Sequence, residues 1–99
     1  MDRRVTPQVV LMMIEFFIPH ADSLKSKRRV VRSFKDRVRA KFNASVAEIG
    51  FVEEWQRTVV GITMISNERQ QLSKNVNAIS RLLEDITDIE LLNIETEWY

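Results

Sequence analysis

The chain has no cysteine, and it has only two glycines, two prolines and one histidine among its 99 residues. Without cysteine there is no disulfide framework, thiolate nucleophile or cysteine-ligated metal. Two glycines are too few for a glycine-rich loop that cradles phosphates. His20 has no second imidazole with which to build a metal site or a catalytic triad. We therefore expect no metal and no cofactor. The absence of a catalytic motif leans against an enzyme without deciding the question.

Long hydrophobic runs are also missing. The longest, from Val9 to Ile18, is interrupted by Glu15, ends in a Pro-His pair and lacks a small-residue cleavage site. It is too short to span a bilayer. We interpret it as a buried strand of a cytoplasmic protein without membrane contact. The length predicts one domain over residues 1–99, with a loose N-terminal segment over residues 1–7.

The charge is unevenly distributed along the chain. Residues 22–43 contain nine lysines and arginines against two aspartates, whereas the other residues carry a net charge of −6. The formal total is only +1. Such an asymmetry indicates an electrostatic partner more strongly than the total does.

Within residues 22–43, helical spacing places the basic residues beside an apolar stripe. Apolar residues recur at Leu24, Val31, Phe34, Val38 and Phe42. The candidate nucleic-acid-binding residues are Lys25, Arg28, Arg29, Arg32, Lys35 and Arg39. Three interpretations stay open: contact with RNA or the ribosome, contact with an acidic protein, or a solvated helix face. An ion pair between Arg32 and Asp36, four residues apart, would favour the solvated face.

Hydrophobic periodicity predicts four strands and two helices. The strands are expected over residues 8–18, 43–49, 55–66 and 89–98, and the helices over residues 22–42 and 67–84. The order β-α-β-β-α-β predicts an α+β ferredoxin-like sandwich, with a four-stranded antiparallel sheet and two helices on one face. In the strand order 4-1-3-2, the two long apolar strands are central.

Finer expectations concern the ends and faces of these elements. Ser23 is expected to cap the first helix, and Asn67 with Gln70 resembles a capping box for the second. In the last strand, Leu92, Ile94 and Trp98 are expected on one face.

The first strand is apolar on both faces, and two helices cover only one side of the sheet. Val9, Leu11, Met13 and Phe17 would then form an exposed patch, together with residues such as Val59 and Ile65. Large exposed apolar patches usually mark interfaces, so we predict a homodimer through this face. In the alternative, Phe51, Val52 and the N-terminal segment cover it.

Trp55, Gln56 and Arg57 follow the acidic pair Glu53 and Glu54. A tryptophan at the base of a hairpin usually buries its ring, which we expect here in preference to an exposed recognition tip. Arg57 is expected to pair with Glu48 across the hairpin.

Several short segments stand in an order that resembles a known family. They are Ser23-Leu24-Lys25, Lys27-Arg28-Arg29, Phe42-Asn43, Ser45-Val46-Ala47-Glu48, Trp55-Gln56-Arg57 and Ser66-Asn67. The chain is similar, over residues 8–98, to the small bacterial domain-of-unknown-function family that includes the YlxP proteins. The resemblance implies a ferredoxin-like fold and a cytoplasmic bacterial protein, and it supplies no activity. Genes of the family often lie beside translation-initiation and ribosome-maturation genes, which hints at RNA or ribosomes.

Together these features favour a non-enzymatic domain that binds RNA or the ribosome through the basic helix. One alternative is a homodimer that binds a small molecule, or catalyses a reaction, at its interface. The other is a protein–protein adaptor. No small-molecule ligand is evident from the sequence.

Overall fold

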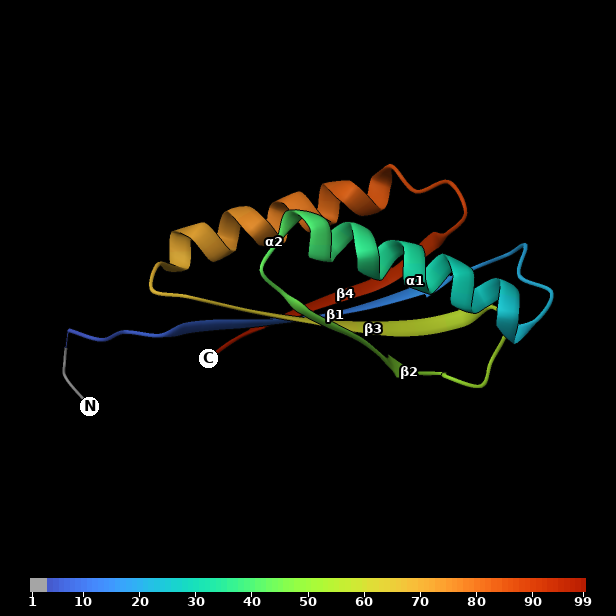
Figure 1. Cartoon of the computed structure of the whole chain (residues 1–99), viewed down its shortest axis with the longest axis horizontal. Coiled ribbons are helices and arrows are strands. Elements are labelled where there is room, and N and C mark those ends of the chain that lie inside the picture. Colours follow the sequence, from blue (N-terminus) through green and yellow to red (C-terminus); the bar gives the residue numbers. More distant parts are fainter. Residues whose placement is uncertain (1–3) are drawn as a thin grey trace.

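The computed structural model describes residues 4–99, so the first three residues of the expected loose N-terminal segment lie outside the described residues. Four strands and two helices follow one another in the predicted order (Figure 1). The elements are β1 (Gln8–Phe17), α1 (Leu24–Lys41), β2 (Ser45–Gly50), β3 (Arg57–Ser66), α2 (Arg69–Glu84) and β4 (Glu90–Trp98).

The four strands form one antiparallel sheet in the order β2-β3-β1-β4, with β1 and β3 in the centre. Both helices lie on the same side of this sheet (Figure 1). The α+β ferredoxin-like sandwich predicted from the sequence is therefore confirmed.

The core lies between the sheet and the helices. Alternate residues of β1 are fully buried there: Val10, Met12, Ile14 and Phe16. Phe16 meets Phe34 of α1 edge to face, with ring centroids 5.7 Å apart, an arrangement that aromatic pairs prefer. The alternate residues of β1 and the apolar stripe of α1 therefore pack against each other, as the sequence predicted.

Helix α1 begins as expected. The Ser23 hydroxyl accepts a hydrogen bond from the Ser26 amide at 3.0 Å, and the Ser26 hydroxyl accepts one from the Ser23 amide at 3.2 Å. The expected cap of α2 is wrong, because its N-cap is Glu68, which makes no side-chain capping bond. The Ser66 hydroxyl accepts from the Glu68 amide instead, and this turn moves the start of the helix beyond Asn67.

One expectation for β4 is also wrong. Glu15 pairs with Asn93 but the next residue, Phe16, pairs with Leu91, so Leu92 is an extra residue in a bulge. The bulge breaks the alternation and leaves Leu92 exposed, whereas Ile94 and Trp98 pack against the core.

Strand β3 starts two residues later than expected, so Trp55 and Gln56 belong to the loop that precedes it.

In the described part of the chain, no helix is long and apolar enough to cross a membrane.

Candidate functional site

The basic stripe, defined as Lys25, Arg28, Arg29, Arg32, Lys35 and Arg39, runs along α1. Lys25, Arg28, Arg29 and Arg32 are exposed, and Lys35 is half-buried. Among residues 4–99, none of these five side chains forms an ion pair or a side-chain hydrogen bond. Their charges are therefore available to a partner.

One residue of the stripe, Arg39, is not a free cation. Arg39 donates a hydrogen bond to the backbone carbonyl of Val46 in β2 at 2.9 Å, so its guanidinium is partly engaged. The expected ion pair between Arg32 and Asp36 is absent from the described residues, within the 4 Å limit for such pairs. Without that ion pair, one argument for a helix face that is merely solvated no longer holds.

Lys27 belongs to the same basic segment but turns inward and is fully buried. Its ammonium lies 2.8 Å from the Glu48 carboxylate. The ammonium also contacts four backbone carbonyls at 2.7–3.3 Å, those of Phe51, Val52, Glu54 and Arg57. A buried ammonium needs such compensation. Lys27 therefore holds the connection between β2 and β3 in place, including Phe51, whose φ of 55° is unusual for a non-glycine residue.

The expected pair between Arg57 and Glu48 is wrong. Glu48 faces the core side, where it also accepts a hydrogen bond from the Thr58 hydroxyl at 2.6 Å. Arg57 lies on the opposite face and pairs with Glu15 of β1 at 3.0 Å, and its guanidinium lies 3.9 Å from the centre of the Phe51 ring. Adjacent residues of a strand point to opposite faces, and Glu48 shares its face with Thr58 rather than with Arg57.

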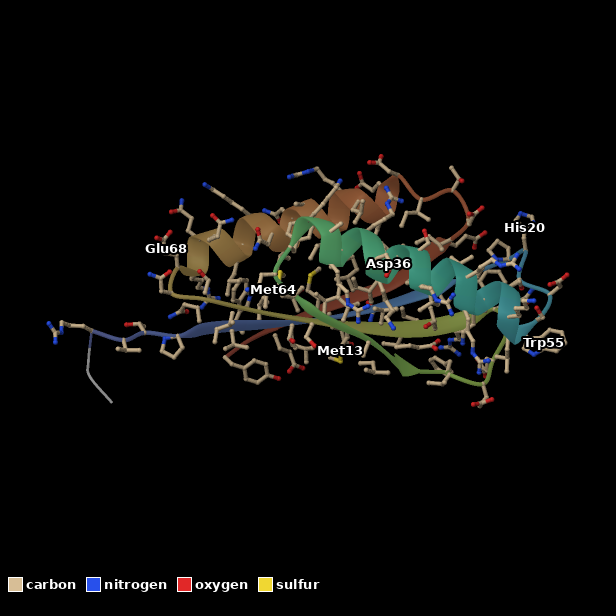
Figure 2. The ribbon with its side chains drawn as sticks, in the orientation of Figure 1. Met13, His20, Asp36, Trp55, Met64 and Glu68 are labelled. Carbon is tan, nitrogen blue, oxygen red and sulfur yellow. The ribbon has the colours of Figure 1, made fainter. Side chains whose placement is uncertain are left out.

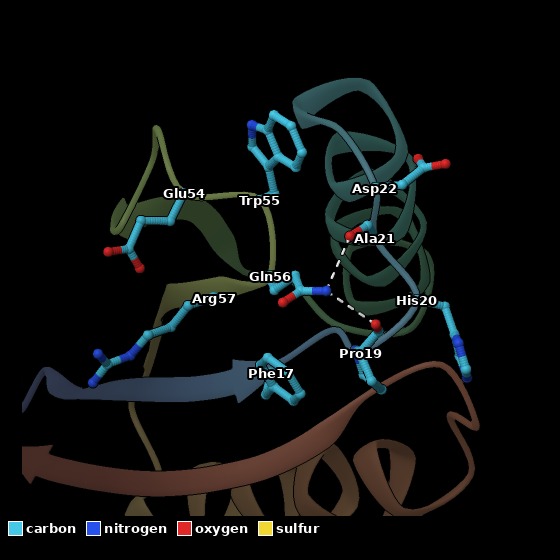
Figure 3. A pocket seen from close by; sticks show the side chains of 9 residues that line it. All are labelled: Phe17, Pro19, His20, Ala21, Asp22, Glu54, Trp55, Gln56 and Arg57. Atoms are coloured by element: carbon cyan, nitrogen blue, oxygen red, sulfur yellow. Dashed lines mark hydrogen bonds between the residues drawn. The ribbon is translucent and has the colours of Figure 1, made fainter.

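A pocket of about 680 Å³ opens where the β1–α1 loop meets the loop before β3 (Figure 3). We call it the end pocket. Its lining residues are Phe17, Pro19, His20, Ala21, Asp22, Glu54, Trp55, Gln56 and Arg57.

Gln56 joins the two loops of the end pocket. Its side-chain amide donates to the carbonyls of Pro19 and Ala21 at 3.0 and 3.2 Å, as Figure 3 shows. The backbone carbonyl of Gln56 accepts a hydrogen bond from the backbone amide of Ile18 at 2.7 Å. These bonds link segments more than thirty residues apart and give the pocket fixed walls.

Trp55 stands at the mouth of the end pocket and is 55% exposed, so the expectation that its ring would be buried is wrong. The loop carries it beyond the end of the sheet, at the same end of the molecule as His20 (Figure 2). Sequence reasoning missed this site because its walls come from two loops that only the fold brings together.

The open face is the side of the sheet away from the helices. Figure 2 shows Met13 on this side, whereas Met64 lies between the sheet and the helices. The four residues predicted to form a dimer interface, Val9, Leu11, Met13 and Phe17, are half-buried. Ile49 and Ile65 are 53% and 62% exposed. The apolar patch expected from the sequence is therefore present, and whether a second chain covers it stays a prediction.

Among residues 4–99, no three His, Cys, Asp or Glu side chains lie close enough together to hold a metal ion. His20 is exposed at the rim of the end pocket.

Comparisons with known proteins agree with the resemblance seen in the sequence. A family model described as "Protein of unknown function (DUF503)" matches residues 9–96. The "Uncharacterized protein YlxP" of Bacillus subtilis (strain 168) is 39% identical over 85 residues, which are 86% of this chain and 92% of that protein. Among solved structures, "De novo designed protein Foldit4" matches with a TM-score of 0.54 at 15% identity, over 92% of this chain and 96% of that one. At that identity the likeness concerns the fold alone.

Proposed function

Because this chain belongs to the DUF503 family of proteins of unknown function, its family assigns it no activity, and we propose from its surface chemistry that it binds RNA through the basic stripe of α1. One observation carries the proposal. Four exposed cations, Lys25, Arg28, Arg29 and Arg32, share one helix surface without an acidic partner among the described residues. These four are among the nine lysines and arginines of residues 22–43.

The dimensions of the stripe suit a phosphate backbone. From Lys25 to Lys35 the helix rises about 15 Å, at 1.5 Å per residue. Successive phosphates of one strand lie roughly 6–7 Å apart, so the stripe matches about two or three of them. Arginine binds phosphate oxygens with two parallel hydrogen bonds, whereas lysine acts as a point charge. Three of the four exposed cations are arginines, which favours phosphate as the ligand.

The test is the binding of ribosomal RNA fragments to the purified protein at two salt concentrations. With two or three contacts on a single strand, the affinity should fall roughly 7- to 20-fold between about 50 and 200 mM salt. The Arg28→Glu/Arg32→Glu variant should lose most binding and show a shallower salt dependence. The matched control is Lys74→Glu/Arg81→Glu on α2, which changes the net charge by the same amount at exposed positions away from the stripe.

Two results would contradict the proposal: no binding by the wild type at low salt, or an equal loss in the two charge-reversal variants. Retained contacts with a protein after nuclease treatment would instead favour the adaptor. If the function is instead ligand binding or catalysis at a dimer interface, reversing the charges of the stripe should leave that function unchanged.

We further propose that a second copy of the chain covers the open face. The centre of this face is apolar, and its one central carboxylate, Glu15, is already paired with Arg57. A face without an unpaired central charge can be buried against its own copy at little electrostatic cost. Glu95 and Glu97 lie on the edge strand β4, directly opposite Met13 and Leu11, so the second copy has to leave these two carboxylates in contact with water.

A further inference from the structure

We propose that the end pocket receives one unpaired nucleobase of the bound RNA, stacked on the ring of Trp55. The inference rests on the proposed RNA binding and adds the class of RNA that is bound: single-stranded rather than fully paired. It assigns the phosphates to α1 and the base to the adjoining pocket.

The exposure of Trp55 is the first observation. A tryptophan ring is a large apolar surface, yet this one is 55% exposed. Within the described residues, no aromatic ring or cation lies against it. The other tryptophan, Trp98, is half-buried and has the guanidinium of Arg69 at 4.3 Å from its ring centre. An unpartnered aromatic face beside a basic surface is the arrangement on which single-stranded bases stack.

The size and lining of the end pocket are the second observation. Its volume of about 680 Å³ falls within the range of small-ligand sites, roughly 300–1,000 Å³. Phe17 and Pro19 supply apolar lining. Among the described residues, the His20 imidazole, the Asp22 carboxylate and the Gln56 side-chain oxygen form no hydrogen bond. Figure 3 shows the His20 and Asp22 side chains on the outer side of the β1–α1 loop, so the Gln56 oxygen is the group that can meet the polar edge of a base.

Charge decides which part of a nucleotide enters the pocket. Two of the lining residues, Asp22 and Glu54, carry carboxylates, which point outward from the pocket in Figure 3. The one guanidinium in the lining, that of Arg57, is already held between Glu15 and Phe51. The described lining therefore offers a phosphate no free ammonium or guanidinium, whereas an amino group of a base would find an acceptor in the Gln56 side-chain oxygen.

The phosphates have their own site nearby. Asp22 ends the pocket wall and Leu24 begins α1, so Lys25 and Arg28 lie in the first two turns of the helix beside the pocket. A strand whose backbone follows the basic stripe reaches the pocket at the start of the helix. Since Gln56 and Lys27 fix the two loops, the pocket is formed before the RNA arrives, which lowers the cost of binding.

The test uses the fluorescence of Trp55 and a single-stranded RNA of mixed sequence, about ten nucleotides long. The Trp98→Phe variant leaves Trp55 as the only tryptophan. We expect its fluorescence to be quenched on addition of the single strand and unchanged on addition of a blunt RNA duplex. In the Trp55→Phe variant, the remaining Trp98 should report no quenching by either RNA.

Affinities complete the test. Trp55→Ala should weaken single-strand binding roughly 5- to 150-fold, with an unchanged salt dependence, because it removes stacking but no phosphate contact. Trp55→Phe should retain most of the affinity. If the wild type binds through the stripe but Trp55→Ala binds equally well and Trp55 is not quenched, the base pocket is wrong and the proposed RNA binding stands. If the wild type binds no RNA, both proposals are wrong.

Discussion

The ammonium of Lys27 lies 2.8 Å from the carboxylate of Glu48, and the lysine side chain is fully buried. This pair joins α1 to β2, and the carbonyls around Lys27 join both to the loop before β3. The loop carries Trp55 and Gln56 to the end pocket. A lysine within the most basic segment of the chain is therefore a structural residue, and its exposed neighbours carry the proposed function.

Lys27→Met should destabilise the protein by about 3–5 kcal/mol, because it removes the buried ammonium that compensates the charge of Glu48 and donates to the surrounding carbonyls. Chemical denaturation measures this loss. Lys25→Met removes the same charge at an exposed position and should change the free energy of unfolding by less than about 0.5 kcal/mol. A loss below about 1 kcal/mol for Lys27→Met would contradict the role given to Lys27.

Ser23→Ala should lower the free energy of unfolding by about 1 kcal/mol, since the Ser23 hydroxyl accepts a hydrogen bond from the Ser26 amide at the start of α1. Asn67→Ala should lower the free energy of unfolding by less than about 0.5 kcal/mol, because Asn67 does not cap α2. Thermal or urea unfolding of the two variants compares the caps directly. Equal losses would mean that the assignment of the α2 cap is wrong.

Leu11→Lys should prevent self-association, because it places a charged side chain on the central strand of the open face, between Thr63 and Glu97. Sedimentation should show twice the mass of the chain for the wild type and the mass of one chain for the variant. Asn77→Lys, at an exposed position of α2, should leave the dimer intact. A wild-type monomer at high protein concentration would refute the dimer.

Tyr99 is the only tyrosine, so its ionisation can be followed by absorbance without interference from another phenol. Its hydroxyl donates to Glu97 at 2.6 Å, and this bond, with the nearby negative charge, raises the pKa of Tyr99 above 10.0. The bond therefore contributes stability at pH values below the ordinary tyrosine pKa. That contribution is lost as the pH rises through the folded-state pKa.

The absorbance midpoint of the wild type should thus lie above pH 10.0. Glu97→Gln should lower the midpoint, because it removes the carboxylate charge from the phenol. The same midpoint in both proteins would show that the bond does not persist in solution.

Much of the fold could be predicted from local pattern. The alternation in β1 identified its buried residues, and the helical spacing of Val31, Phe34 and Val38 identified the packed face of α1. Lys27 also carries a signal that sequence reasoning overlooked. It lies three residues after Leu24 and four before Val31, on the apolar face. A lysine at such a position is expected to reach a buried partner or the surface.

Other features left no readable trace in the sequence. The bulge at Leu92 depends on how β4 aligns with β1, and the partner of Arg57 depends on which face of β3 it occupies. Trp55 was expected to be buried because a tryptophan usually is. Its exposure follows from the path of a loop that Lys27 and Gln56 hold in place.

By itself the sequence determined the elements, the strand order and the concentration of positive charge on α1, because hydrophobic periodicity and helical spacing are local properties of the chain. Only the tertiary structure decided which cation is buried, which cations are free and where the end pocket forms. The physical reason is that these features depend on contacts between segments far apart in the chain. Lys27 meets carbonyls 24 to 30 residues away, and Gln56 meets carbonyls 35 and 37 residues away.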